Sequence, residues 1–303
     1  MPDQSARLQA ARGGAAVGPV LARGLLRLTG KDRLKFLHRV STQKVDGLPP
    51  GAAVHAAFLG VKGHVVADAI VVLRADEALL DVEPAALEPL RTHLVRYVVM
   101  DQVKVEDVSA AFRVVPAFGP AGKDLARGRA PAAVAWEDAR RGAPALDVLL
   151  PVAEAQAFHD GLAAAGATPL SADDLEALRV LAGVARFGAD LDGTRLPMEA
   201  ALVASAVSFE KGCYLGQEVV ARGTFRGQIQ KGLVQVALPP GTAAGAPLTA
   251  GGKEVGVVTS AVETPEGRVG LAYLRRAHWN EGERLALPAG EAVVRRVLVL
   301  ERE

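Results

Sequence analysis

The chain has 303 residues, enough for two or three domains, and half of them are hydrophobic, so a sizeable core can be buried. Lysine and arginine total 35 and aspartate and glutamate total 34, so the net charge of +1 provides no global attraction to nucleic acid or to an anionic membrane. Aromatic residues make up only 4% of the chain, which argues against rows of rings stacked on single-stranded nucleic acid.

The cysteine and histidine content limits the metal chemistry. A single cysteine, Cys213, excludes an internal disulfide and a four-thiolate iron–sulfur or zinc site within one chain. The six histidines form no closely spaced metal-binding pair, so we expect no metal site. No apolar run reaches the roughly 18 residues of a membrane span. The first 20 residues lack a signal-peptide core. We therefore expect a soluble cytoplasmic protein with a frayed N-terminal arm.

The first hundred residues predict a unit of strands and helices. Residues 20–30 alternate as a strand, and Asp32 precedes an apolar helical face that begins at Leu34. Pro84 is placed as in the first turn of a second helix. Further strands are expected at 52–59, 65–74, 78–83 and 97–106.

The next segment predicts a second unit. Residues 112–117 and 145–150 are expected to be strands and 152–165 a helix, whereas 120–144, rich in Gly, Pro, Ala and Arg, are expected to be loop-like. Ser171 and Asp174 form an approximate capping box for a helix that continues to about Gly183.

From about residue 232 onward, the composition and the hydrophobic pattern of the chain change. Short strands are expected at 232–238, 254–262, 268–274 and 292–301, separated by turns rich in Gly and Pro. This regular spacing predicts a small all-β barrel at the C-terminus.

One stretch surrounds the only cysteine: Lys211, Gly212, Cys213, Tyr214, Leu215, Gly216, Gln217 and Glu218, followed shortly by Arg222. The glycines allow a tight turn or a close approach of a ligand. Lys211 and Arg222 could bring positive charge to the thiol and favour the reactive thiolate. The alternative is a buried, inert cysteine at a turn.

This stretch, K-G-C-Y-x-G-Q-E and then V-A-R, resembles the signature of the YgfZ-type folate-binding proteins, relatives of the glycine-cleavage T-protein. The motif cysteine of that family is functionally important, which points to Cys213 as a reactive thiol. Lys211, Gly212, Tyr214, Gly216, Gln217, Glu218 and Arg222 match the motif without individual roles.

A second segment resembles the T-protein pattern L-R-L-E-A-G, G-x-D and P-x-E, here ending in Leu196-Pro197-Met198-Glu199. The resemblance implies that Glu199 contacts the pterin of tetrahydrofolate, where one carboxylate can accept two adjacent N–H groups. The alternative is a solvated acid after a proline. Leu181 stands where T-protein has glutamate.

A third segment, Gly63 to Val71, resembles the T-protein run G-G-x-x-D-D-x-x-V. Only the second acid, Asp68, is retained, because the first position is Ala67. Loss of one carboxylate argues against aminomethyl transfer, which needs acid–base chemistry there. Asp68 is a candidate folate contact, or else a strand residue facing solvent. Arg222 and Arg226 could bind the carboxylates of the folate tail; the alternative for Arg226 is a basic surface turn.

The resemblance implies an α+β fold, with three domains in a T-protein-like ring. The expected divisions are 1–109 plus 168–231 for a discontinuous folate-binding domain, 110–167 for an inserted α+β domain, and 232–303 for the barrel. Folate would occupy the central channel, and Cys213 would open onto the cavity that Glu199 lines.

By resemblance, the function is that of a tetrahydrofolate-binding accessory protein in iron–sulfur cluster assembly or repair, with cluster-assembly or client proteins as partners, including tRNA-modifying enzymes. The alternative is a folate-dependent aminomethyltransferase of glycine cleavage, against which Ala67, Leu181 and the cysteine motif argue. The net charge and the few aromatics argue against an RNA-binding module acting directly on tRNA.

Overall fold

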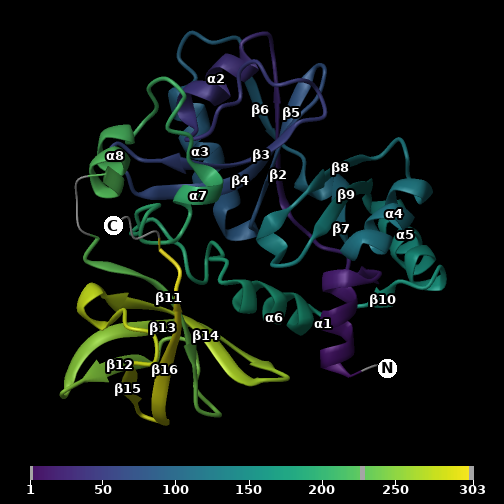
Figure 1. The fold of residues 1–303 in the computed structure, drawn as a ribbon. Helices are drawn as coiled ribbons and strands as arrows, with labels where there is room; N and C mark the ends of the chain where they lie inside the picture. Colours follow the sequence, from purple (N-terminus) through teal and green to yellow (C-terminus); the bar gives the residue numbers. More distant parts are fainter. Residues whose placement is uncertain (1–2, 226–228, 300–303) are drawn as a thin grey trace.

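The computed structural model describes residues 3–225 and 229–299, which form three units arranged around a central region (Figure 1). Two units are five-stranded sheets with helices, and the third is a closed barrel. This arrangement confirms the expected α+β class with a C-terminal barrel.

The first unit is an antiparallel sheet with strand order β3-β4-β5-β2-β6. Successive side chains of β4 point to opposite faces of this sheet and pack into different cores. Ala67, Ala69 and Val71 pack into a core that includes residues of the two helices of this unit, whereas Ile70 and Val72 pack toward the second unit. The elements are β2 (Gly24–Thr29), α2 (Arg33–Val40), β3 (Ala53–Leu59), β4 (Val65–Leu73), β5 (Glu77–Val82), α3 (Leu87–Tyr97) and β6 (Lys104–Asp107).

The second unit has strand order β10-β1-β7-β9-β8. Its helices α4 and α5 pack on the sheet through Ala126, Ala155 and Phe158. The elements are β1 (Ala16–Val17), β7 (Phe112–Phe118), α4 (Gly119–Arg129), β8 (Val134–Glu137), β9 (Ala145–Pro151), α5 (Val152–Ala164) and β10 (Thr168–Pro169).

Two expectations for this unit were wrong. The N-terminal segment is helix α1 (Gln4–Gly13), capped by Asp3, and its buried Leu8 and the following β1 attach it to the second unit rather than leaving it frayed. Residues 120–144 contain α4 and β8 instead of a loop, because Pro120 suits the first helical turn and the small Gly122 allows close contact with the backbone of Ala16.

The third unit is the closed barrel, in the order β11-β14-β13-β12-β15-β16. The four expected strands are present, and the sequence reasoning missed the two short ones, β12 and β15. Likewise, of the strand expected at 97–106 only β6 is formed. The barrel strands are β11 (Lys231–Ala237), β12 (Pro247–Ala250), β13 (Lys253–Thr264), β14 (Gly267–Arg275), β15 (Arg284–Leu287) and β16 (Gly290–Val297).

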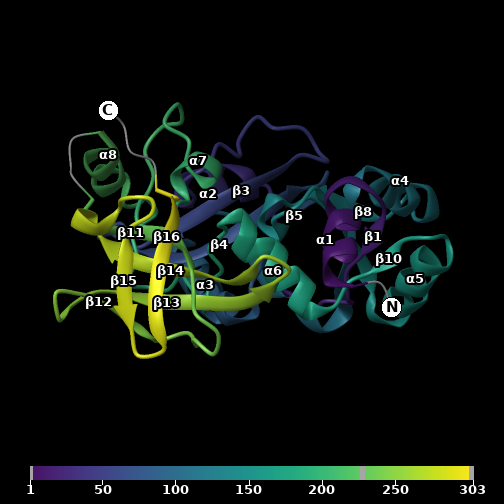
Figure 2. The same ribbon diagram turned by 60° about the horizontal axis from the view of Figure 1, so that its bottom comes forward.

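Helix α6 (Ala172–Ala182) connects the three units, and Figure 2 shows it between the barrel and the second unit. At its N-terminus the Ser171–Asp174 capping box is fully formed, and Asp174 also accepts a hydrogen bond from Arg7 of α1 at 2.7 Å. At its C-terminus the barrel residue Gln235 donates to the carbonyls of Val180 and Leu181.

A buried ion pair fixes the same helix to the barrel. Arg179 of α6 donates to Asp190 at 2.6 Å and to Ser260 of β13 at 2.8 Å, and Ser260 donates to Asp190 at 2.7 Å. The Arg179 and Asp190 side chains are 6% and 0% exposed, so removal of Arg179 would leave the Asp190 carboxylate without its cation inside the protein.

The remaining helices, α7 (Val203–Ala206) and α8 (Gln217–Phe225), lie in the segment between α6 and the barrel. None of the helices in residues 3–225 and 229–299 has the length and apolarity that crossing a membrane requires.

We predict that Arg179→Ala lowers the free energy of unfolding by about 3–5 kcal/mol, because it leaves the buried Asp190 carboxylate without its cation. Arg91→Ala is the control, since Arg91 pairs with Glu88 on an exposed helix surface, and we expect little or no loss. Chemical denaturation measures both, and equal losses would contradict the assignment.

Candidate functional site

A cavity of about 580 Å³ lies where the three units meet. The first unit contributes His55 and Ile70, the second Glu137 and Arg140, and the barrel Arg296. The segment 200–205 closes another side. A smaller cavity of about 330 Å³ shares Arg140 and Ala185 with it, so the two adjoin. A polar cavity between domains is a usual place for a ligand.

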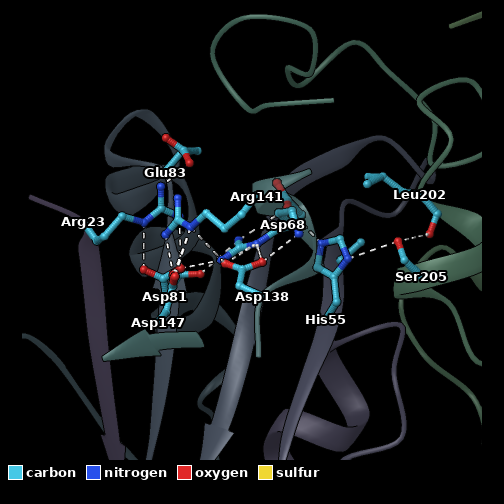
Figure 3. Close-up of polar contacts among 12 residues, drawn as sticks. Arg23, His55, Asp68, Asp81, Glu83, Asp138, Arg141, Asp147, Leu202 and Ser205 are labelled. Carbon is cyan, nitrogen blue, oxygen red and sulfur yellow. Dashed lines mark hydrogen bonds and ion pairs between the residues drawn. The ribbon is translucent and has the colours of Figure 1, made fainter. Parts of the chain in front are cut away.

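Beside these cavities a buried charge network joins the first and second units (Figure 3). Arg23 donates to Asp81 at 2.8 and 3.0 Å and also pairs with Glu83. Arg140, from the second unit, reaches across to Asp81 as well. The pairing holds the two sheets together at the cavity wall.

The second half of the network lies within the second unit. Arg140 donates to Asp138 at 2.8 and 3.0 Å, and Arg141 donates to Asp147 at 2.5 Å. Burial would raise the pKa of Asp138, but attraction from Arg140 and Arg141 outweighs it and lowers the pKa. Burial raises the pKa of Asp147 to about 6, and the nearby Asp138 adds to this effect.

The carboxylates of Asp81, Asp138 and Asp147 lie within 4.8 Å of one another. Such a cluster would suit a cation, but each of these carboxylates accepts hydrogen bonds from an arginine. The guanidinium groups provide the compensating charge here.

Asp68 faces this region and is 4% exposed, so it is not the solvent-facing strand residue that the sequence left open. Its carboxylate lies 3.0 Å from His55 Nε2 and 3.7 Å from Arg140. Burial would raise the pKa of Asp68, but the hydrogen bond from His55 and the charge of Arg140 lower it overall. The other ring nitrogen of His55 lies 3.1 Å from Ser205 Oγ (Figure 3).

Ala67 lies on the opposite face of β4 from Asp68. It is fully buried in the core that includes residues of α2 and α3. A carboxylate at this position would enter hydrocarbon and not the cavity, so Ala67 does not remove a cavity acid. The sequence argument that used Ala67 against aminomethyl transfer therefore loses its force.

Cys213 is exposed, in the loop before α8, so it is not the buried cysteine of the alternative interpretation. Lys211 anchors this loop: its ammonium donates to the carbonyls of Ser41 at 2.5 Å and Gln43 at 3.3 Å, and to that of His38. The lysine thus fastens the loop to the end of α2 through three backbone acceptors.

The motif glycine Gly216 brings the loop against the β3–β4 turn. Its φ of 79° favours glycine, and a Cβ there would lie 2.9 Å from the carbonyl oxygen of Gly60. Val219, in helix α8, packs against Gly63 of the same turn. The Cys213 thiol therefore lies on an exposed loop that Lys211 and Gly216, on either side of it, anchor to the first unit.

The other motif residues lie around this loop. Tyr214 is buried, its ring lies 5.1 Å from the Lys211 ammonium, and burial raises its pKa to about 12. Arg222 is 70% exposed and pairs with Glu218 at 3.6 Å. Gly212 is exposed and Gln217 begins α8. Arg226 lies outside the described residues.

Glu199 is 8% exposed and is therefore not the solvated acid of the alternative interpretation. Its carboxylate accepts from the Leu196 backbone N–H at 3.1 Å and lies 4.0 Å from Lys231. It lines a cavity of about 410 Å³ at the barrel junction, with Lys231 and Arg275, and the lining includes neither Asp68 nor Cys213. The structure thus brings Asp68 together with His55 and Ser205, which sequence reasoning missed, and places Glu199 and Cys213 separately.

Comparisons with known proteins match this architecture. The GCVT N-terminal domain matches residues 4–140, and the CAF17 C-terminal β-barrel domain matches residues 230–298. The crystal structure of the glycine cleavage aminomethyltransferase from Bartonella henselae superposes with a TM-score of 0.83 at 19% identity, covering 99% of this chain and 90% of that one. The fold is therefore that of the aminomethyltransferase superfamily.

Sequence comparison is more specific. The chain is 29% identical over 301 residues to the aminomethyltransferase of Rubrobacter xylanophilus, covering 90% of this chain and 81% of that protein. It is 33% identical over 286 residues to the human mitochondrial iron–sulfur cluster assembly factor IBA57, covering 86% of this chain and 76% of the relative. The chain belongs to the IBA57 family within this superfamily.

We predict that Lys211→Met lowers the free energy of unfolding by about 1–3 kcal/mol, because three carbonyl groups lose their donor. Burial lowers the Lys211 pKa from 10.5 to about 8. Between these values the folded protein binds fewer protons than the unfolded chain, so this lysine makes stability rise with pH there.

Denaturant titrations from pH 7.5 to 10.5 measure both effects. The control is Lys44→Met, which removes an exposed lysine nearby. Lys211→Met should lose part of the alkaline rise that the wild type and the control share. Identical pH profiles in all three proteins would refute the role of Lys211.

Proposed function

We propose that this protein is an accessory factor in the assembly or repair of iron–sulfur clusters, and the exposed Cys213 on its anchored loop is the observation that carries the proposal. A cluster generally needs four protein ligands, and one thiolate provides only one. The chain would therefore hold a cluster only together with ligands from a partner, or exchange thiols with that partner.

The surface around the loop suits a partner protein. Phe209 and Phe225 are 39% and 49% exposed and contact each other edge to face, with ring centroids 4.8 Å apart. Val61, 68% exposed, lies on the β3–β4 turn against which the loop packs. Exposed apolar and aromatic side chains of this kind are typical of protein interfaces.

We further propose that the protein binds tetrahydrofolate, with Glu199 accepting the pterin N–H groups. The donor set fits this cofactor. The Glu199 carboxylate lines a cavity, and its hydrogen bond from the Leu196 N–H leaves further lone pairs that can accept the pterin N–H groups. When bound, folate would supply one-carbon or redox chemistry.

The cysteine motif supports a YgfZ-type role, in which the clients include iron–sulfur enzymes that modify tRNA. A single free, exposed thiol suits a reducing compartment, and we propose the cytoplasm.

A second candidate, folate-dependent aminomethyl transfer, is favoured by one observation. Asp68 keeps a buried, ionised carboxylate at the wall of the cavity of about 330 Å³, where it could transfer a proton to a folate bound there. The test is an assay of aminomethyl transfer from a lipoyl carrier. Transfer at ordinary enzymatic turnover would establish this activity and overturn the proposed role in iron–sulfur cluster assembly.

We predict that Cys213→Ala folds normally but loses support for cluster-dependent enzymes, because the exposed thiol makes no packing contribution to the core. The measurement is the activity of a cluster-dependent enzyme in cells that carry only the variant. Glu210→Ala, an exposed change in the same segment, is the control and should retain support. Undiminished enzyme activity with Cys213→Ala would overturn the proposed function.

We predict that Glu199→Ala weakens tetrahydrofolate binding about tenfold or more, since hydrogen bonds to a charged group contribute roughly 1.5–3 kcal/mol. Calorimetry on the purified protein measures the affinity. Asp68→Asn, in a cavity that does not include Glu199, is the matched comparison and should have the smaller effect. A larger loss of affinity with Asp68→Asn than with Glu199→Ala would instead indicate that the pterin binds beside Asp68.

A further inference from the structure

Ser205, His55 and Asp68 form a hydrogen-bonded row at the central cavity (Figure 3). Ser205 Oγ lies 3.1 Å from His55 Nδ1, and His55 Nε2 lies 3.0 Å from Asp68 Oδ2. Ser205 and His55 both line the cavity of about 580 Å³, and Asp68 lines the adjoining cavity of about 330 Å³. The order is hydroxyl, imidazole, carboxylate, as in serine hydrolases, with the two ring nitrogens exchanged.

The charges fix where the protons lie. The pKa of Asp68 is lowered despite burial, because His55 and Arg140 favour its ionised form. An ionised carboxylate only accepts hydrogen bonds, so Nε2 of His55 must carry the proton. In the neutral ring Nδ1 then has a free lone pair that can accept the Ser205 hydroxyl proton at 3.1 Å, closer than the Leu202 carbonyl oxygen at 3.5 Å.

The backbone holds the serine in place. Thr42 donates to the carbonyl of Ala206 at 2.5 Å, and the Ser208 N–H donates to the carbonyl of Thr42 at 2.9 Å. These bonds fasten the chain immediately after Ser205 to the first unit, which also carries His55 and Asp68. The serine side chain itself remains exposed to the cavity.

We propose that Ser205 is an activated nucleophile for acyl transfer from a small ester or thioester. Its Oγ would form a bond to the acyl carbon while the bond from that carbon to the leaving oxygen or sulfur breaks. His55 Nδ1 takes the serine proton and delivers it to the leaving group. Water then releases the acyl group by the same steps in reverse.

The cavity wall indicates the substrate class. Arg296 lines the cavity and donates to the carbonyl of Ala182 at 2.8 Å, whereas the Arg140 guanidinium is paired with Asp81 and Asp138. The exposed Arg296 guanidinium suits an acyl group that carries its own carboxylate or phosphate.

The test is labelling of the purified full chain with a fluorophosphonate probe, which forms a bond from serine Oγ to phosphorus and releases fluoride. Peptide mass spectrometry should place the adduct on Ser205, and Ser205→Ala should abolish it. His55→Gln should slow labelling about 100-fold or more, because the general base is lost. Asp68→Asn should slow it as well, since the ring tautomer is no longer fixed.

Ser5→Ala, which removes an exposed serine on α1, is the control and should label like the wild type. The melting temperature of each variant is measured, so that a loss of labelling is interpreted only for variants that fold. Absence of an adduct on Ser205 in the wild type, or equal labelling rates in wild type and His55→Gln, would overturn the proposal. The experiment uses neither folate nor an iron–sulfur cluster, so its failure would leave the function proposed for Cys213 untouched.

Discussion

The buried pairing of Asp81 with Arg23 and Arg140 is the interaction on which the geometry of the central cavity depends. Arg23 and Asp81 belong to the first unit and Arg140 to the second. Removing three such charges from water is costly, and only close, multiple hydrogen bonds offset that cost. The arrangement is therefore intolerant of small displacements. It fixes the angle at which the two sheets meet and holds Asp68 beside Arg140.

The sequence predicted the fold well where a local signal agreed with the tertiary structure. The Ser171–Asp174 capping box and the alternating strands of β3 and β4 formed as expected. The prediction failed at α4 because glycine and alanine suggest a loop in isolation, whereas close packing against Ala16 makes small residues an advantage. The short β12 and β15 were missed since four residues carry too little periodicity.

The candidate site was predictable only in part. The motif around Cys213 located the loop, and the P-x-E pattern located Glu199. No spacing in the sequence indicates that His55 would lie between Asp68 and Ser205, which is 150 residues from it in the chain. That contact depends on β3 pairing with β4 and on Thr42 fastening α7, both long-range events. The thiol and the cavity residues consequently form separate sites on one scaffold.

The solitary exposed thiol has a consequence for oxidative damage. A cysteine oxidised to sulfenic acid is usually rescued by condensing with a neighbouring sulfur, and Cys213 has no second cysteine anywhere in the chain. Recovery must come from a thiol on another molecule, such as a low-molecular-weight thiol or a second protein. The protein thus depends on its surroundings to return Cys213 to the reduced state.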